Sequence, residues 1–592
     1  MWGYVAPLRD MQFVLDEWLE AGKDWAQIPA FAELGADTVQ QILAAAADFA
    51  AHTLQPINLP ADRSGCRWEA GDVRTPQGFV QAYRQFREAG WPALACDPEY
   101  GGQGLPLLLN AALYEMLMAA NHAWSMYPGI VHGAYDCLRT HASREIRSRY
   151  LPKIVSGEWL CTMCLTEPQA GSDVGLVRTR AEPRADGTYS ISGTKIFISG
   201  GEHDLTDNIL HLVLARLPDA PAGTRGISLF LVPKRLPTAG SPANALRCEG
   251  IEKKMGIKGS ATCVMNFGGA QGWLIGEPHR GLAAMFVMMN AARLHVGLQG
   301  LGHAEMAYQN ARRHAAERRQ MRSPERPADA GEAHPGGADP IDFHPAMRRT
   351  LMTLRALVEG ERALGYWSAH LLDLAEHDPD ESRRAAAQDL LSLLTPVIKS
   401  FFTENGFNLS SAALQVFGGY GYIQDYGIEQ SVRDSRIAMI YEGSNEIQGV
   451  DFLVRKVIGD GGRKFKLLLQ WIADEAAACR AVPALEQFGA ELDALTGRWQ
   501  KVTGEIIAEA GTAPAAAYGI AGDHLRVAGL CLLGACWART ARVSMARSQE
   551  PFYRGKLDAA RFYFDCLLPE AGWRLDLIGR RHLPLPWVRP TE

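Results

Sequence analysis

The N-terminal third of the chain has apolar positions at helical spacing. From Asp37 onward, a capping residue precedes apolar residues three and four positions apart, which predicts a helix that begins there. A second helix is predicted to begin at Thr75 as its cap, with Pro76 in the first turn. The Pro-rich segment 56–60 predicts a break between these two helices. Further helices are predicted over residues 107–120 and 143–155. Residues 37–159 are therefore expected to form a helical domain, preceded by an extension at 1–36.

The pattern then changes to period two. Apolar, β-branched and aromatic residues alternate with polar ones, and turn-forming pairs such as Asp186-Gly187 separate the runs. The predicted strands are 189–198, 209–215, 226–232 and 262–267. Residues 160–280 are therefore expected to form a β domain between helical ones.

Helical spacing returns at Gly281 and continues to the end. Residues 323–340 interrupt it with a long Pro- and Gly-rich stretch, which is either disordered or packed on the surface, or else a functional lid. A Gly-rich break at 459–462 separates two predicted helical domains, 281–456 and 457–592. The pattern predicts a mainly α protein with a central β domain.

Composition and charge narrow the classes of function. The 592 residues carry 60 Lys and Arg against 66 Asp and Glu, a formal net charge of -6, which disfavours nucleic-acid binding by bulk charge. The 11 cysteines are odd in number and widely spread, which is typical of reduced thiols. Cys161 and Cys164 form a C-x-x-C without further ligands nearby, so core thiols are favoured over zinc and no metal is expected.

No targeting or membrane segment is evident. The first eleven residues contain Arg9 and Asp10 and no apolar signal core. Near the C-terminus, the longest apolar stretch, 527–538, is too short for a bilayer, which requires ~20 helical residues. A cytoplasmic protein without a membrane span is expected. Common motifs for nucleotide hydrolysis, zinc peptidases and serine hydrolases (GxxxxGK[ST], HExxH, GxSxG) are absent.

Three segments could carry chemistry. In CLTEPQAGSD at 164–173, Gly171 permits close backbone approach, and Ser172 with backbone N–H groups could hold an anion or a carbonyl; an ordinary turn is the alternative. In QVFGGYGY at 415–422, the paired glycines either end a helix or let the backbone approach a ligand.

The third segment surrounds Glu442. Ile440 and Tyr441 precede this carboxylate and Gly443 follows it. If the carboxylate is buried there, its pKa would rise toward the range of a general base. The alternatives are an exposed loop acid, or part of a helix N-cap with Ser444.

Taken in order, these segments resemble the acyl-CoA dehydrogenase family of FAD flavoproteins. The resemblance covers roughly residues 37–456. It rests on PEYGGQG at 98–104, TEPQAGSD at 166–173, GTKIFIS at 193–199, QVFGGYG at 415–421, RD at 433–434 and YEG at 441–443. It implies an N-terminal helical domain, a β-barrel-like middle domain and a C-terminal four-helix bundle, here with an extra C-terminal helical domain. The chain ends at 1–11 and 555–564 are similar to the long subgroup that includes 3-methylmercaptopropionyl-CoA dehydrogenases.

The resemblance implies α,β-dehydrogenation of an acyl-CoA to a trans-2-enoyl-CoA. In this family FAD takes a hydride from the β-carbon while a glutamate, here Glu442, takes the α-proton. The backbone N–H of that glutamate helps to hold the thioester carbonyl, as in an oxyanion hole. An electron-transfer flavoprotein would then accept the electrons. The chain length of the acyl group stays open.

The resemblance also assigns binding residues. Those expected at the FAD of the same chain are Met163, Leu165, Thr166, Gly171, Ser172, Phe197, Ser199, Ser444 and Glu446. Those expected to reach the FAD of a neighbouring subunit are Arg318, Gln415, Gly418 and Gly419. Ser172, Arg293 and Gly443 are expected at the substrate. A homodimer or homotetramer follows from the second group.

Some positions depart from the family pattern. Phe197 replaces a Trp, Gln169 a Gly, and Met321 a Phe beside Arg318. Some relatives place the base directly before the arginine that matches Arg293, but that residue here is Ala292, which leaves Glu442 as the candidate. Two alternatives are an acyl-CoA oxidase that uses dioxygen and a nucleic-acid-binding flavoprotein of the same fold. The nearly balanced charge of the C-terminal tail disfavours the second.

Overall fold

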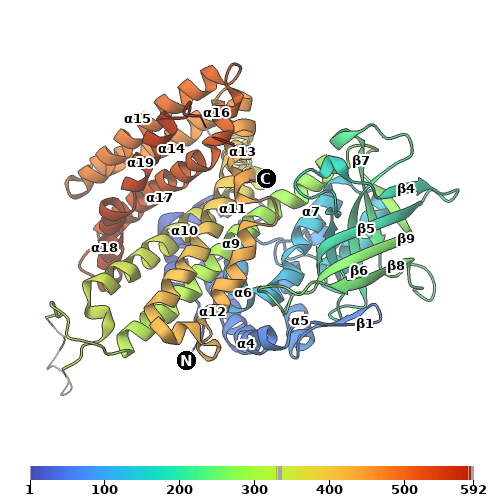
Figure 1. Ribbon diagram of the computed structural model, residues 1–592, viewed down its shortest axis with the longest axis horizontal. Coiled ribbons are helices and arrows are strands. Elements are labelled where there is room, and N and C mark those ends of the chain that lie inside the picture. Colours follow the sequence, from blue (N-terminus) through green and yellow to red (C-terminus); the bar gives the residue numbers. More distant parts are fainter. Residues whose placement is uncertain (1, 329, 331–336, 585, 588–592) are drawn as a thin grey trace.

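The computed structural model describes residues 2–328, 330, 337–584 and 586–587. Figure 1 shows a β domain on one side of the molecule, long helices in the centre and a further helical lobe on the opposite side. This order of helical, β and helical segments confirms the predicted fold class.

The N-terminal helical part contains six α-helices. They are α3 (Ala36–Phe49), α4 (Gln55–Ser64), α5 (Phe79–Glu88), α6 (Leu107–Gly129), α7 (Val131–His141) and α8 (Arg144–Val155), with a hairpin of β1 (Arg67–Glu69) and β2 (Asp72–Arg74) after α4. Ser143 caps α8, because its hydroxyl accepts a hydrogen bond of 3.3 Å from the N–H of Ile146.

Three predicted boundaries in this part are wrong. The first helix begins at Ala36 after Gly35, one residue before Asp37. The predicted break at 56–60 lies inside α4, which holds Pro56 in its first turn, where a missing N–H is tolerated, and Pro60 in its interior. The next helix begins at Phe79, not beside Thr75, because the Thr75 N–H and hydroxyl bond Asp204 at 3.1 and 2.7 Å instead.

The β domain closes into a barrel-like ring. Its strands are β3 (Trp159–Cys164), β4 (Arg180–Pro183), β5 (Tyr189–Ser199), β6 (Asn208–Arg216), β7 (Ile227–Pro233), β8 (Leu246–Ile251) and β9 (Thr262–Ile275). The order β6-β4-β5-β9-β7 returns to β6 through a β6–β7 pairing, with β3 and β8 paired at the outside of this ring. All four predicted strands are present, and β3, β4 and β8 are additional.

The central bundle is built on three long helices. These are α9 (Gly281–Glu317), α10 (Pro345–His377) and α11 (Glu381–Phe417), followed by the short α12 (Ile428–Ser435) and α13 (Asn445–Val450). Among the described residues, α9 alone is long and apolar enough to match a membrane span in length and composition, but 61% of that window is buried in the bundle. Burial of this kind is typical of a core helix.

α6 packs antiparallel to α9 and touches it most closely at Gly302. A Cβ atom on Gly302 would lie 2.8 Å from the backbone nitrogen of Ala119, so only glycine fits without moving a helix. At the other end of the contact, His295 Nδ1 lies 3.0 Å from the Gly129 carbonyl oxygen. The two helices therefore cross tightly at Gly302 and move apart from there toward the β domain.

The C-terminal lobe holds the remaining helices. They are α14 (Arg463–Arg480), α15 (Glu486–Glu509), α16 (Pro514–Gly519), α17 (Ala521–Met545), α18 (Pro551–Cys566) and α19 (Pro569–Gly579). The N-terminal extension, with α1 (Leu8–Gln12) and α2 (Ala21–Trp25), packs against this lobe. Trp18 Nε1 donates to the Cys536 carbonyl at 3.3 Å, and the Tyr553 hydroxyl bonds Glu17 at 2.6 Å.

The predicted long loop at 323–340 lies partly outside the described residues. Its described ends are held together, since the Ser323 N–H donates to Asp339 at 3.0 Å and its hydroxyl donates to the Phe343 carbonyl at 3.0 Å. All 11 cysteines are free thiols. Within the described ranges, no group of three or more His, Cys, Asp or Glu side chains is placed to hold a metal.

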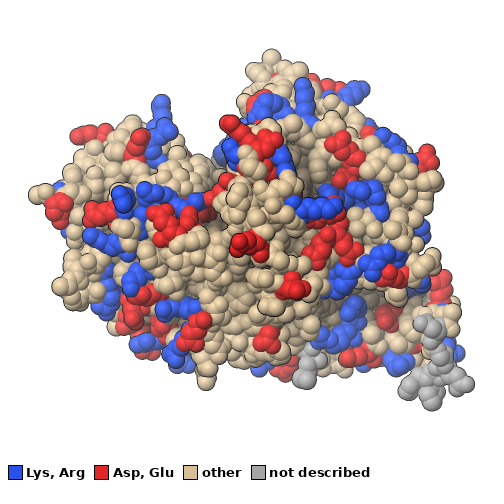
Figure 2. Space-filling model, turned by 180° about the vertical axis from the view of Figure 1, so that it is seen from behind, with Lys and Arg blue, Asp and Glu red and all other residues tan. Residues whose placement is uncertain are grey.

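Charged side chains are mixed over the face seen in Figure 2. Lys and Arg alternate with Asp and Glu across this face, and basic side chains do not gather into one broad patch on it. The same face is hollowed between the β domain and the C-terminal lobe.

Candidate active site

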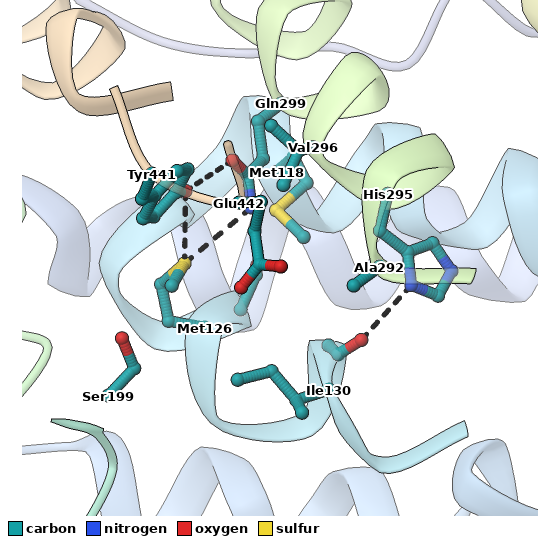
Figure 3. Close-up of a pocket in the computed structure, with 12 residues that line it drawn as sticks. Met118, Met126, Ile130, Ser199, Ala292, His295, Val296, Gln299, Tyr441 and Glu442 are labelled. Carbon is teal, nitrogen blue, oxygen red and sulfur yellow. Dashed lines mark hydrogen bonds between the residues drawn. The ribbon is translucent and has the colours of Figure 1, made fainter. Parts of the chain in front are cut away.

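A small cavity lies where α6 and α9 diverge, and Glu442 forms part of its wall. Its volume is about 40 Å³. It is lined by Met118, Ser125, Met126, Gly129, Ile130, Ser199, Ala292, His295, Val296, Gln299, Tyr441 and Glu442. Figure 3 shows the Glu442 carboxylate in the middle of this group, with Ser199 from the β domain on one side and Gln299 on the other. The cavity thus joins the helical bundle to the β domain.

The backbone presents Glu442 in a conformation that few residues other than glycine adopt. Its φ is 56°, and Gly443 follows with a φ of 85°. The Gln448 side-chain amide donates to both carbonyls, at 3.1 Å for Glu442 and 3.3 Å for Gly443. Such strain persists only where the surroundings hold it, and it is common at functional sites.

Burial and the charges around Glu442 act on its pKa in opposite directions. Burial raises the pKa of the Glu442 carboxyl, while the cations Arg293 and Lys399 lower it. Arg293 is buried and lies 3.7 Å from Asp451. Lys399 is fully buried, donates to Asn445 Oδ1 at 3.0 Å, and has its pKa lowered to about 7 by burial. The net effect raises the pKa, so the carboxylate is a stronger base than an exposed one.

Tyr441 anchors the wall next to Glu442. Its hydroxyl donates to Gln299 Oε1, lies 3.5 Å from the Met126 sulfur and lies 3.3 Å from His122 Nε2. His122 and His303 share a bond of 2.9 Å, and burial lowers the pKa of both, to about 4 for His303. Both imidazoles are therefore neutral near pH 7. His122 holds the Tyr441 hydroxyl, and His303 holds His122, without adding charge.

The β-domain side is fastened by a buried ion pair. Lys195 Nζ donates to Glu167 at 2.8 Å and to the Leu165 carbonyl at 3.0 Å, while the Thr179 hydroxyl donates to Glu167 at 2.6 Å. The N–H of Ile196 also donates to the Thr166 carbonyl at 2.9 Å. The two segments that contain Thr166 and Ser199 are therefore locked together.

Phe197 lies in β5, two residues before Ser199, and its side chain is exposed to solvent. It has a φ of 59°, and 59% of its surface is exposed. Burying an aromatic ring is strongly favourable, so an exposed ring on a strained backbone is typical of a ligand-facing position. Met163, Leu165 and Thr166 are partly buried near it, whereas Gly171 and Ser172 lie exposed in the turn after β3. Gln169, one of the departures, donates to Glu167 at 2.6 Å.

The second predicted cofactor group lies far from Glu442. Arg318 follows Val296, a lining residue, by 22 residues along α9, or roughly 33 Å at ~1.5 Å per residue. Its guanidinium lies 5.3 Å from the centre of the Tyr420 ring, close to the chain segment that contains Gly418 and Gly419. Gln415 is exposed at the end of the preceding α11. One chain therefore does not bring both groups to a single ligand.

The residues after Glu442 lead into α13. Ser444 occupies the N-cap position of this helix, without a side-chain capping bond. Its hydroxyl instead bonds Glu446 and lowers the pKa of that exposed carboxyl. Glu442 itself is outside this cap, so the interpretation of Glu442 as a capping residue is wrong.

A larger cavity of about 490 Å³ adjoins the first and shares His295 with it. Arg293, Asn290 and Lys456 are among its lining residues. Arg293 Nε is buried and has no hydrogen-bond acceptor among the described residues. This cavity thus offers an unused cationic donor close to Glu442.

Several residues of the site were not predicted. They are His122, Met126, His295, Gln299, His303 and Lys399. One signal was present: His295, Gln299 and His303 repeat every four residues on an otherwise apolar helix, which places them on one face. Buried polar groups on one face of a helix require hydrogen-bond partners, so such a row of polar residues indicates a candidate functional site.

Comparisons with known proteins match most of this chain to one family. Four family descriptions match in order: the N-terminal domain (36–158), middle domain (162–269) and C-terminal domain (279–455) of acyl-CoA dehydrogenase, and "Acetyl-CoA dehydrogenase C-terminal like" (468–584). A 3-methylmercaptopropionyl-CoA dehydrogenase from Ruegeria pomeroyi is 42% identical over 522 residues, 87% of each chain. A butyryl-CoA dehydrogenase from Syntrophomonas wolfei is 32% identical over 96% of this chain and 95% of its own.

The structure of Caenorhabditis elegans ACDH-11 in complex with C11-CoA has the same fold. It matches with a TM-score of 0.76 at 18% identity, over 96% of this chain and 92% of its own. The order of domains and these two relatives, which each match 87% or more of this chain, lead to one conclusion. The chain belongs to the acyl-CoA dehydrogenase family, whose members are FAD-binding oxidoreductases.

Proposed function

We propose that this protein oxidises an acyl-CoA thioester between its α- and β-carbons, with Glu442 as the base that removes the α-proton. The observation that carries this proposal is the strained, partly buried setting of Glu442, whose carboxylate lines a cavity that reaches the β domain at Ser199. Burial raises the pKa of this carboxyl, which suits a base for a weakly acidic C–H group.

The residues around Phe197 fit the flavin ring of FAD. The exposed Phe197 lies two residues before Ser199, which lines the cavity of Glu442, and the neighbouring Ile196 bonds the Thr166 carbonyl. When bound there, FAD would accept the hydride of the β-carbon. The contacts of Met163, Leu165, Gly171 and Ser172 with FAD are part of this proposal.

Residues of this chain would perform the proton transfer and hold the carbonyl. The N–H of Glu442 donates toward the thioester carbonyl, where negative charge develops as the α-proton leaves. Arg293 and Lys399 lower the pKa of Glu442 and so partly offset the effect of burial. The bound acyl group fills the small cavity and excludes water, which makes the carboxylate more basic at the moment of transfer.

The larger cavity is proposed to take part of the CoA moiety. It shares His295 with the small cavity, and Arg293 offers it a buried donor without an acceptor. Phosphate and amide oxygens of CoA are acceptors that suit such a guanidinium. The similarity to the 3-methylmercaptopropionyl-CoA and butyryl-CoA enzymes supports a short acyl group on this CoA.

The test of the proposal is Glu442→Gln. The purified variant is expected to retain yellow flavin but to fail to bleach when butyryl-CoA or 3-methylmercaptopropionyl-CoA is added without oxygen. Glu381→Gln is the matched control, because it removes an exposed carboxylate at the start of α11, outside the site. Full bleaching by the Glu442 variant would contradict the assignment.

We also propose an electron-transfer flavoprotein as the electron acceptor and a homo-oligomer as the working form. An oxidase would instead release hydrogen peroxide during turnover in air, so peroxide at the rate of substrate loss would contradict the first proposal. For the second, Arg318, Gln415, Gly418 and Gly419 would bind the FAD of a neighbouring subunit, because they lie too far from Phe197 in one chain. Light scattering should give the mass of two or four chains.

A further inference from the structure

We propose that the enzyme is selective for short, uncharged acyl chains, with at most about four heavy atoms beyond the thioester carbonyl. The inference deepens the proposed function and rests on it. Three side chains, Met118, Gln299 and Tyr441, set this limit because they close the cavity beyond Glu442. Butyryl and 3-methylthiopropionyl groups satisfy the limit, and hexanoyl and octanoyl groups exceed it.

The volume of the cavity sets the size of the acyl group. It holds about 40 Å³, whereas a dry cavity that admits benzene measures ~150 Å³. One water molecule requires ~10–15 Å³ by the same measure, so the space corresponds to roughly three or four heavy atoms. The α- and β-carbons must lie beside Glu442, which leaves room for one or two further atoms.

The helices close the far end of the cavity. Along α9 the lining residues run from Ala292 to Gln299, and the next residue that faces α6 is Gly302. There the helices touch so closely that a Cβ atom on Gly302 would lie 2.8 Å from the Ala119 nitrogen. A longer acyl chain cannot continue between α6 and α9 past this crossing.

The polar groups at this end resist opening. Gln299 accepts a bond from the Tyr441 hydroxyl, and its Nε2 lies 3.6 Å from the Met126 sulfur. Tyr441 is also held by His122, which is bonded to His303 at 2.9 Å. Moving Gln299 aside would leave buried polar groups without partners, which is costly. Met118 lacks such bonds, so it is the flexible part of the wall.

The chemistry of the wall selects an uncharged chain end. Within the described part of the chain, no Lys or Arg lines this cavity. His295 has its pKa lowered to about 4 by burial and is therefore neutral near pH 7. A terminal carboxylate, as in a dicarboxylic acyl-CoA, would lose its water here without gaining a cation. A methyl or thioether end has no such cost.

The experiment measures kcat/KM for the holoenzyme with propionyl-, butyryl-, 3-methylthiopropionyl-, hexanoyl-, octanoyl- and glutaryl-CoA. One methylene in a pocket changes this ratio by about 10–200-fold. The kcat/KM for butyryl- and 3-methylthiopropionyl-CoA is expected to exceed that for hexanoyl-CoA by at least 10-fold, and that for octanoyl-CoA by more. Met118→Ala is expected to raise the hexanoyl-to-butyryl ratio at least 10-fold. Exposed Met255→Ala is the matched control.

If Met118→Ala fails to fold, Val296→Ala is the second variant. It also enlarges the cavity, and it removes less apolar volume than Met118→Ala does. Wild-type activity on octanoyl-CoA within threefold of butyryl-CoA would overturn the inference, as would unchanged ratios in both folded variants. These results leave the proposed function intact, since the flavin still bleaches. Absence of bleaching with every acyl-CoA would overturn the proposed function itself, and the inference with it.

Discussion

The side-chain amide of Gln448 donates a hydrogen bond of 3.1 Å to the backbone carbonyl of Glu442. This bond joins α13 to the residue that we propose as the base, and a second bond of 3.3 Å reaches the Gly443 carbonyl. A left-handed conformation such as that of Glu442 costs on the order of 1–3 kcal/mol and requires such support.

Gln448→Leu should therefore reduce turnover more than binding. We expect kcat to fall by roughly 10–100-fold, since a misplacement of ~1 Å can cost 10²-fold, with little change in KM. The free energy of unfolding should fall by about 1–3 kcal/mol, because two carbonyls lose their donor. Steady-state kinetics and urea unfolding check this, with exposed Gln470→Leu as the control. A change in KM alone would argue against a positioning role.

Lys399→Met should shift the pH dependence of the reaction. Activity requires the Glu442 carboxylate, and Lys399 lowers the pKa of Glu442. Removing this cation raises that pKa, so the acid limb of kcat against pH is expected to move to higher pH. Lys466→Met, an exposed substitution, should leave the limb in place. An acid limb at the wild-type position in Lys399→Met would contradict this electrostatic role.

The same substitution should increase stability. The pKa of Lys399 is lowered to about 7 in the folded protein, below its ordinary value near ~10.4 when unfolded. Between these values the unfolded chain binds more protons, so this lysine destabilises the fold most at low pH, and its penalty is lost as pH rises through ~10. Lys399→Met is therefore expected to unfold at higher urea concentration than wild type at pH 6. A lower midpoint would show that Lys399 stabilises the fold.

Lys195→Met should weaken the flavin side of the site. It leaves Glu167 buried without its cation, and breaking a buried pair from one side costs about 3–5 kcal/mol. Because the pair fastens the segments of Thr166 and Ser199, the flavin content of the purified protein is expected to fall as well. Adding Glu167→Gln should restore much of the stability, since no buried charge remains. Thermal unfolding and the flavin-to-protein absorbance ratio measure the two effects.

Gly302→Ala tests the close crossing of α6 and α9. The added methyl group would meet the Ala119 nitrogen at 2.8 Å, so the helices must separate, at about 1–3 kcal/mol. Gly497→Ala in α15 is the control, because nothing lies within 4 Å of the added atom. There the free energy of unfolding is expected to rise by about 0.4–1 kcal/mol. Calorimetry of both variants separates a contact effect from simple helix propensity.

The local sequence pattern predicted the fold class, but it did not predict elements whose structure depends on contacts with residues distant in the sequence. β5 was predicted because its residues alternate near its start, although a bulge between Lys195 and Ile198 interrupts the alternation of buried positions further on. β3 is mostly buried and reads as a short apolar run, which periodicity alone does not assign. Thr75 has the right residue type for a helix cap, but its bonds to Asp204, 129 residues away, replace that role.

The site was predictable only where sequence neighbours define it. Glu442 and Gly443 adjoin in the chain, so their local motif was sufficient to single them out. Lys399 acts on Glu442 from α11, and no short motif links residues that far apart. Gln299 meets Tyr441, 142 residues further along the chain, only because the segment before α13 packs against α9, so its role follows from tertiary structure. Only the regular spacing of His295, Gln299 and His303 gave a sequence signal for site residues outside the motif of Glu442.

The contact between the N-terminal extension and the C-terminal lobe has a consequence for synthesis on the ribosome. Arg9 donates to the Tyr553 hydroxyl at 2.7 Å across a separation of 544 residues. At roughly 5–20 residues per second, the leading segment emerges on the order of 30–100 s before its partner helix. During this interval Trp18 and Phe13, both buried in the finished protein, have no α17 or α18 to cover them. The nascent chain is thus expected to need a chaperone at its leading end until translation is nearly complete.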